Sequence, residues 1–258
     1  WPLTKDKLLA AHQIINREVE QGHLEESFSP WNTPIFVIQK KDKSKFRLLH
    51  DLREVNKCME DMGALQPGLP LPSAIPVNWP VVVMDIKDWF FSIPLAPQDS
   101  ERFAFTVPST NLCEPAKRYQ WKVLPQGMKN SPTICQAAVA RVLEPLRRRF
   151  ANAIIIHYMD DLLIAAATQQ QVDETEKEIV KQLADKGLHV QETKTQKGDS
   201  ITYLGTRISP QSVVPQPLKF NIQVKTLHDV QKLVGVIQWV RNLIGIPNEM
   251  MLPLFELL

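Results

Sequence analysis

Residues 154–164 read IIIHYMDDLLI, so that two adjacent carboxylates, Asp160 and Asp161, separate two apolar runs. Short apolar runs on either side of a turn predict buried strands, and we therefore expect a β-hairpin with both carboxylates at its tip. A second run, Val81 to Met84, predicts another buried strand, which ends at Asp85. On local grounds alone, an aspartate at the end of a strand is most often a turn residue or a helix cap.

Clustering of these three aspartates would favour a divalent metal site. Like charges beside core strands are costly, and neighbouring carboxylates raise one another's pKa unless a cation lies among them. A cluster made of oxygen ligands suits Mg²⁺ or Mn²⁺. Adjacent residues of a regular strand face opposite ways, so only one of Asp160 and Asp161 would then face Asp85. A tight turn at this point would relax that restriction.

The remaining elements predict an α+β fold, because strands and helices mix without strict β-α-β alternation. Apolar spacing, caps and glycines predict helices at 4–22, at 132 to about 149, at 171–186, and from the capping-box sequence at 226–229. The expected caps of the first two helices are Thr4 and Ser131. Strands are expected at 35–38, 46–49 and 201–204, the first two forming a hairpin, and the proline-rich segment 67–80 is expected to be an irregular connector.

Composition excludes several classes of protein. The chain has 258 residues, a net charge of +2 and 44% hydrophobic residues, which is typical of a globular protein and not of a disordered or fibrous one. Neither a G-x-G-x-x-G sequence nor a P-loop occurs. Cys58, Cys113 and Cys135 are odd in number and far apart, which predicts a reducing compartment, no disulfide framework and no zinc site. Because the net charge is only +2, any nucleic acid would have to bind a local cluster of basic residues. One such cluster is at 38–47, which holds five basic residues and one acidic residue.

The ends of the chain and its apolar runs predict a soluble fragment. No basic-then-apolar leader is present, and no apolar run reaches the roughly 18 residues of a membrane span. The sequence begins at Trp1 without a methionine and stops at Leu258, which indicates a piece of a longer chain.

Several ordered motifs resemble those of retroviral reverse transcriptases. Tyr158-Met159-Asp160-Asp161 resembles the YMDD signature of that family. The other matching stretches are LREVNK at 52–57 (template contact), MDIKD at 84–88 (first catalytic motif), LPQGM at 124–128 followed by Ser131-Pro132, YLG at 203–205 (primer grip) and QKLVG at 231–235 (first thumb helix). The resemblance runs from Trp1 to Leu258, and the sequences of the motifs are most similar to those of alpha- and betaretroviral or endogenous retroviral polymerases.

This resemblance implies an α+β right-hand polymerase fold. Fingers would occupy 1–60 and 94–130, the palm 61–93 and 131–210, and the start of a thumb 211–258. The implied partners are an RNA or DNA template–primer duplex and deoxynucleoside triphosphates, without a membrane. The connection and ribonuclease H regions of Pol would be absent from the chain, and the implied location is the virion core or host cytoplasm.

The implied reaction is attack of a primer 3′-hydroxyl on the α-phosphate of an incoming deoxynucleotide. Two Mg²⁺ ions, with Mn²⁺ as a possible substitute, about 3.5–4 Å apart would polarise the attacking oxygen and stabilise the leaving pyrophosphate. By resemblance, Asp85 and Asp160 bridge both ions, Asp161 is a weaker ligand, and the carbonyl of Ile86 completes one shell. Lys194 would protonate the pyrophosphate as a general acid, although an exposed lysine is the simpler interpretation.

The nucleotide site implied by the family has several parts. Lys40 and Arg47, on the arms of the first hairpin, would bind the triphosphate. Lys40 would offer a point charge, and Arg47 would offer a planar guanidinium that can donate two hydrogen bonds. Phe90 would exclude a 2′-hydroxyl by collision with its ring. The other implied contacts to the nucleotide are Ile86, Lys87, Asp88, Trp89, Gln126, which would touch the region of the sugar 3′-hydroxyl, and Met159, which would pack against the ribose or the primer terminus.

The template–primer contacts centre on the predicted thumb helix. Gln231, Gly235 and Trp239 recur every four residues and share a face. Glycine inside a helix costs about 1 kcal/mol relative to alanine, which indicates close approach of a bulky partner. The family implies the duplex minor groove; the alternative is packing of another helix. The further implied contacts are Leu49, Asp51, Arg53, Asn56, Gly127, Gln136, Tyr158, Leu204 and Gly205.

Trp89 departs from the family pattern, which has a small residue, alanine or cysteine, in the pocket for the 3′-hydroxyl of the nucleotide. Overpacking a tight site costs about 1–3 kcal/mol, so we expect weakened or lost polymerase activity. One alternative is therefore a catalytically impaired endogenous retroviral remnant that keeps the fold and nucleic-acid binding. A second is a two-metal phosphodiesterase, against which the LPQG and primer-grip-like motifs argue.

Overall fold

The computed structural model describes residues 3–40, 42, 45–66, 69–110, 114–217 and 224–258. The chain divides into two compact units, which we call unit 1 (Trp1–Leu65 with Lys87–Arg141) and unit 2 (Gln66–Ile86 with Val142–Leu258). Helix α4 (Ser131–Arg149) passes from one unit into the other. Cys113, two lysines of the predicted basic hairpin (Lys41 and Lys43) and residues 67–68 of the predicted connector lie outside the described residues.

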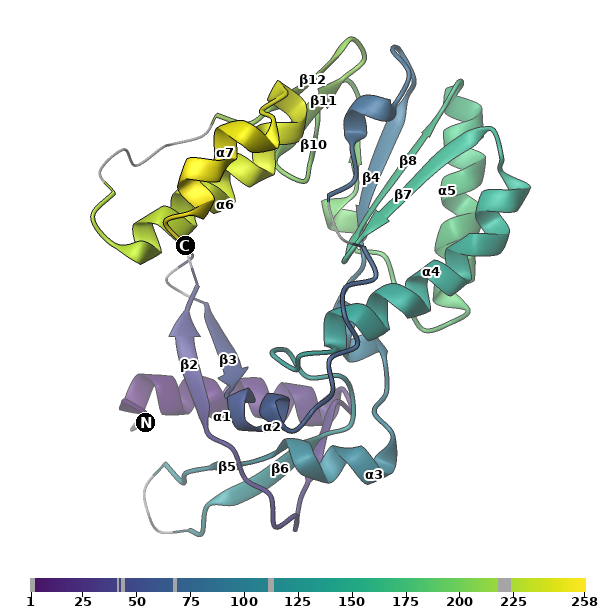
Figure 1. Cartoon of the computed structure of the whole chain (residues 1–258). Coiled ribbons are helices and arrows are strands. Elements are labelled where there is room, and N and C mark those ends of the chain that lie inside the picture. The colour runs from purple at the N-terminus through teal and green to yellow at the C-terminus, as the bar shows by residue number, and fades with distance from the viewer. Residues whose placement is uncertain (1–2, 41, 43–44, 67–68, 111–113, 218–223) are drawn as a thin grey trace. The chain divides into compact units, whose positions relative to one another are not determined.

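Unit 1 combines a long helix with two small antiparallel sheets (Figure 1). Strand β2 pairs with β3, and a second sheet has the order β1-β6-β5. Its elements, besides the first part of α4, are α1 (Lys5–Glu20), β1 (Leu24–Glu26), β2 (Ile35–Gln39), β3 (Phe46–His50), α2 (Arg53–Lys57), η2 (Trp89–Ser92), α3 (Pro97–Ser100), η3 (Glu101–Phe103), β5 (Ala104–Val107) and β6 (Lys117–Trp121).

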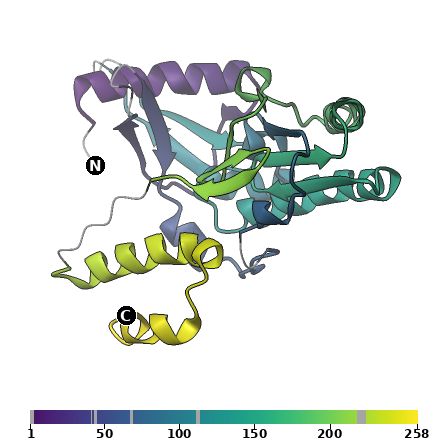
Figure 2. The same ribbon diagram turned by 90° about the horizontal axis from the view of Figure 1, so that it is seen from above.

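The core of unit 1 forms where α1 covers the β2–β3 hairpin, an arrangement visible in Figure 2. Ala11 and Ile15 are the apolar positions of α1 that are almost fully buried, and Ile35 and Val37 alternate inward along β2. Aromatic rings fill the space near the second sheet, with Phe91 and Trp121 stacked at 5.1 Å between centroids. The period-two burial of β2 is what a half-buried strand requires.

Unit 2 is built on a four-stranded antiparallel sheet of order β7-β8-β4-β9. Helix α5 packs against this sheet, and a three-stranded sheet of order β10-β11-β12 packs through an apolar cluster. Its elements, besides the end of α4, are η1 (Pro72–Ala74), β4 (Val81–Asp85), β7 (Ala153–Tyr158), β8 (Asp161–Ala166), α5 (Gln169–Ala184), η4 (Glu192–Lys194), β9 (Gln196–Lys197), β10 (Ile201–Tyr203), β11 (Thr206–Ser209), β12 (Ser212–Pro215), α6 (Leu227–Ile244) and α7 (Asn248–Phe255).

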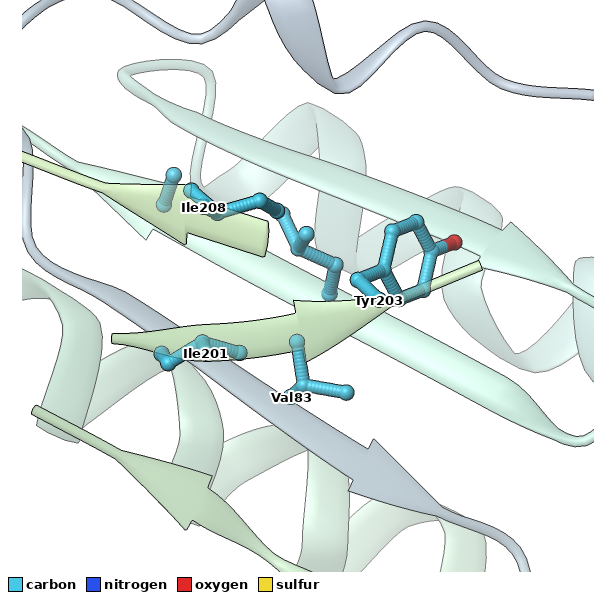
Figure 3. Close-up of a cluster of buried hydrophobic side chains, with 6 residues drawn as sticks. Val83, Ile201, Tyr203 and Ile208 are labelled. Atoms are coloured by element: carbon cyan, nitrogen blue, oxygen red, sulfur yellow. The ribbon is translucent and has the colours of Figure 1, made fainter. Parts of the chain in front are cut away.

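Strand β8 is buried on both of its faces, since every residue from Leu162 to Ala166 is inaccessible. The cluster on one face contains Val83, Leu163, Ile201, Tyr203 and Ile208 (Figure 3). A strand covered on both faces reads as a continuous apolar run, which is why LLI follows the aspartates in the sequence. This packing fixes the end of β8 at which Asp161 lies.

Helices α6 and α7 form a separate apolar cluster within unit 2. Val230, Val234 and Met251 are its buried members. The predicted capping box at the start of α6 is confirmed, because Thr226 and Asp229 each bond the other's backbone N–H. Near the end of this helix, Ile244 is 58% exposed.

The helix, strand and hairpin predictions are confirmed with small shifts at their ends. Helix α4 begins at Ser131 itself, and the Ser131 hydroxyl donates to the Pro125 carbonyl. Thr4 occupies the N-cap position of α1, but its side chain makes no capping hydrogen bond. Helix α5 begins and ends two residues earlier than predicted. Among the described residues, no helix is both long and apolar enough to cross a membrane.

Candidate active site

The three aspartates converge at one end of the unit 2 sheet. Strands β7 and β8 are joined by the two-residue turn Met159-Asp160, and Asp161 is the first residue of β8. Asp161 lies opposite Asp85 in the antiparallel register of β4 and β8. The backbone N–H of Ile86 donates to the carbonyl of Asp160 at 2.8 Å, which ties the turn to the end of β4. The main chain therefore holds all three acidic residues at the same place.

Strand alternation determines which way Asp85 and Asp161 project. Val83 and Leu163 are cross-strand partners, and each lies two residues from one of these aspartates. Residues two apart on a strand share a face, so the two carboxylates emerge from the face that the apolar cluster covers. Burial, followed by the charges of Asp160 and Asp85, raises the pKa of Asp161 to about 6.

Lys194 is the cation that faces these acids. Its Nζ atom lies 2.9 Å from both Oδ1 and Oδ2 of Asp85. This hydrogen-bonded contact, together with the acidic charges around it, raises the pKa of Lys194, so the ammonium form is favoured. The segment before Lys194 is fixed to β4 by a bridge between Ile86 and Val190 and by Gln191, whose N–H donates to the Asp85 carbonyl.

The donor set at this end of the sheet is chemically suited to Mg²⁺ or Mn²⁺. Three carboxylates and nearby backbone carbonyls are hard oxygen ligands, and the charges of Asp160 and Asp85 add to burial in raising the pKa of Asp161. Within the described part of the chain, no three His, Cys, Asp or Glu side chains are gathered closely enough to form a ligand shell. The Lys194 ammonium forms an ion pair with the Asp85 carboxylate, which a bound ion would need as a ligand.

Six predicted contact residues line one cavity of unit 1. The cavity measures about 750 Å³. The predicted residues in its wall are Leu49, Asp51, Arg53, Asn56, Gln126 and Gly127. Sequence reasoning missed other lining residues, among them Lys7, Phe36 and His50. Phe36 could have been found, because it pairs with Leu49 in the predicted hairpin and therefore shares its face.

Hydrogen bonds hold the polar wall of this cavity in place. The Arg53 guanidinium donates two hydrogen bonds to the Asp51 carboxylate, from Nε to Oδ1 at 2.9 Å and from Nη2 to Oδ2 at 2.7 Å. This contact lowers the pKa of Asp51 to about 2. Asn56 donates from Nδ2 to the Gly127 carbonyl at 2.9 Å. Gly127 has φ of +95°, a backbone conformation that favours glycine. Burial lowers the pKa of His50 to about 4, so its imidazole is neutral at pH 7.

The predicted triphosphate and sugar contacts also lie in unit 1. Lys40 follows β2 and Arg47 lies on β3, and both side chains are exposed. Trp89 opens η2 and is only 6% exposed, and its ring lies 4.9 Å from that of Phe90. The other predicted members of this group are Lys87 and Asp88, which are exposed, and Gln136, which is buried on α4.

The predicted primer-grip turn of unit 2 lies against α6. Strands β10 and β11 are joined by Leu204-Gly205, and a Cβ atom on Gly205 would lie 2.6 Å from Nε1 of Trp239. Gln231 and Gly235 are exposed. A Cβ atom on Gly235 would meet no described atom within 4 Å, so the alternative of helix packing at Gly235 is not supported.

Comparison with known proteins identifies the family. Residues 38–208 match the sequence profile described as reverse transcriptase (RNA-dependent DNA polymerase), and residues 215–258 match the reverse transcriptase thumb domain. The Gag-Pro-Pol polyprotein of mouse mammary tumor virus (strain BR6) is 49% identical over 259 residues, which cover 100% of this chain and 15% of the polyprotein. The Gag-Pol polyprotein of Rous sarcoma virus subgroup C (strain Prague) is 49% identical over 256 residues, covering 99% of this chain and 16% of the polyprotein.

The fold and these matches together define the right-hand polymerase fold. The chain belongs to the reverse transcriptase family, and its relatives include betaretroviral and alpharetroviral polyproteins. The chain spans about a sixth of the length of these polyproteins. Reverse transcriptases generally use divalent metal ions and bind template–primer and deoxynucleotides.

Proposed function

We propose that this chain is the polymerase region of a retroviral reverse transcriptase, which adds deoxynucleotides to a primer 3′-hydroxyl on an RNA or DNA template. The convergence of Asp85, Asp160 and Asp161 at one sheet end carries this proposal. Its fingers would be 1–60 and 94–130, its palm 61–93 and 131–210, and its partial thumb 211–258. As part of a Pol protein, it would work in the virion core or the host cytoplasm.

The residues of unit 2 would carry the chemical step. Asp85, Asp160 and Asp161, with the Ile86 carbonyl, would hold two divalent ions, which when bound supply polarisation of the attacking hydroxyl and neutralisation of phosphate charge. Lys194, which already lies 2.9 Å from Asp85, would give a proton from Nζ to the departing pyrophosphate. Met159, Tyr158, Leu204 and Gly205 would position the primer end.

The residues of unit 1 would bind the nucleotide and the template. Lys40 and Arg47 would contact the triphosphate, and the exposure of both side chains supports that role. Phe90 would lie beneath the sugar, with Lys87, Asp88 and Gln126 around the nucleotide. The template would contact the cavity wall described above and Gln136.

The α6 face of unit 2 would contact the duplex. Gln231 and Gly235 are exposed, and the open space over Gly235 leaves room for a backbone to approach closely. Trp239 would contribute from the same face, one helical turn further along. Contacts of this kind depend on groove shape and not on base sequence, as a polymerase requires.

Primer extension tests the proposal directly. Asp160→Asn keeps the size of the side chain and removes its charge, and we expect kcat to fall by about a thousandfold, equivalent to several kcal/mol of lost stabilisation. Asp185→Asn, at the end of α5, is the matched control. An Asp160→Asn protein that extends primers at the wild-type rate would refute the proposal. Release of cleaved nucleotide instead of pyrophosphate would indicate a phosphodiesterase.

A catalytically impaired remnant is the second candidate, and the contact between Trp89 and Phe90 favours it. The proposed sugar gate packs against a ring where the family has a small residue, so its position is expected to differ. We expect Trp89→Cys to raise primer extension with deoxynucleotides several-fold, and to raise extension with dideoxynucleotides less, because these lack the 3′-hydroxyl. Equal rates for wild type and variant would remove this candidate.

A further inference from the structure

Tyr203, the last residue of β10, has a buried hydroxyl without a hydrogen-bond partner among the described residues. The residue is 1% exposed, so bulk water does not replace the missing partner. A buried polar group without a partner lowers stability, and phenylalanine would fill the same space without that cost. The hydroxyl is therefore better explained by a partner that it finds in another state of the molecule.

The ring of Tyr203 lies on the face of the sheet that carries the acidic residues. It packs with Val83 and Leu163, which share that face with Asp85 and Asp161. Figure 3 shows the ring beside this cluster, with the hydroxyl oxygen directed away from Ile208. Tyr203 is therefore on the same side of the sheet as Asp85 and Asp161.

Two groups interact electrostatically with the phenol, the carboxylate of Asp161 and the hydroxyl of Tyr158. A tyrosine phenol carries its proton at neutral pH and can donate it in a hydrogen bond. An ionised carboxylate only accepts hydrogen bonds, which makes Asp161 the complementary partner. The backbone carbonyl of Tyr203 is already engaged, since it accepts from the Thr206 hydroxyl at 2.6 Å.

We propose that Tyr203 is a positioning residue whose hydroxyl donates a hydrogen bond to Asp161 when the acidic residues bind divalent ions. The bond restricts the rotation of the Asp161 carboxylate and aims one oxygen toward the ions. Partners that orient a metal ligand in this way are a general feature of metal sites. The inference rests on the proposed function, because it presupposes that these aspartates hold ions.

The variant Tyr203→Phe tests the proposal, with the Mn²⁺-dependent rise in melting temperature of the whole chain as the readout. Without Mn²⁺, we expect the melting temperature of the variant to equal or exceed that of the wild type. The Mn²⁺ concentration for half-maximal stabilisation should rise about tenfold, as for other residues that orient metal ligands. Tyr119→Phe is the matched control, because Tyr119 is a buried tyrosine of unit 1 outside the proposed site.

A double-mutant cycle with Asp161→Asn identifies the partner. If the hydroxyl acts through Asp161, Tyr203→Phe should have little further effect on the Mn²⁺ response in the Asp161→Asn background. A wild-type response that Tyr203→Phe leaves unchanged, or an equal loss in both backgrounds, would overturn the inference. Absence of any Mn²⁺ response in the wild type would instead contradict the proposed metal site itself.

Discussion

The β7–β8 and β10–β11 hairpins of unit 2 have turns of equal length but different chemistry. The β10–β11 hairpin turns through Leu204 and Gly205, with φ of +43° and +72°, the arrangement of a type I′ turn with glycine second. The β7–β8 hairpin turns through Met159 and Asp160, and Met159 has φ of +53° where a glycine would be favoured. The β10–β11 turn therefore has glycine at one of its two positive-φ positions, whereas the β7–β8 turn has methionine at its positive-φ position.

The difference shows where this molecule tolerates backbone strain. A residue such as Met159 in the left-handed region persists only when its surroundings hold it there, and such strain is common at functional sites. Nε2 of His157 donates to the Met159 carbonyl at 2.8 Å, and Ile86 bonds the Asp160 carbonyl. In the other hairpin Gly205 has a second role, because the Trp239 ring occupies the space of a Cβ atom.

Among substitutions in the two turns, Gly205→Ala should lower the free energy of unfolding most. The added Cβ would lie 2.6–2.9 Å from the Trp239 ring on a backbone with positive φ. We expect a loss of about 2–4 kcal/mol in the free energy of unfolding, measured by urea denaturation. Gly187→Ala is the control, because its φ is +77° but no described atom lies within 4 Å of the new Cβ. Equal losses in both variants would show that Trp239 contributes nothing.

Acidification should destabilise the β7–β8 hairpin, and we expect this to be the second-largest effect. Burial lowers the pKa of His157 to about 4 from 6.5, so the unfolded chain binds a proton that the folded chain excludes. The stability that His157 contributes is thus present above pH 6.5 and is lost as the pH falls toward 4, by about 2–3 kcal/mol.

Urea denaturation across this pH range measures the effect of His157. His157→Gln should flatten the profile partly, because His50 in unit 1 also has a pKa lowered to about 4 and titrates in the same window. His189→Gln, at an exposed position, is the control. A His157→Gln profile as steep as that of the wild type would contradict the prediction.

Met159→Gly should have the smallest effect on stability, and it tests the strain in the β7–β8 turn. Glycine relieves the left-handed strain but adds freedom to the unfolded chain, so we expect a gain of about 0.5–1 kcal/mol in stability. Primer extension should fall several-fold, because Met159 is a proposed contact of the nucleotide. Leu204→Gly, in the other hairpin, should give a similar gain. Destabilisation by Met159→Gly would mean that packing of the methionine side chain outweighs the strain.

Local sequence patterns predicted most of the elements that position the site. The apolar runs around Asp160 and before Asp85 predicted β7, β8 and β4, because strands buried on a sheet need such runs. The capping box predicted the start of α6 because its hydrogen bonds join residues three apart. Helix α7 and the short strand β9 were not predicted, since neither shows a strong periodic pattern.

Short stretches of sequence specify the family motifs and the strand–turn–strand units that present the carboxylates, because both depend on neighbouring residues. The pairing of Lys194 with Asp85, 109 residues away, and the packing of Trp239 beside Gly205 could not be predicted from local sequence and depend on the tertiary fold. The tertiary fold also placed Tyr203 on the same face as Asp161. Contacts between distant segments depend on sheet register and packing, and no local pattern encodes these.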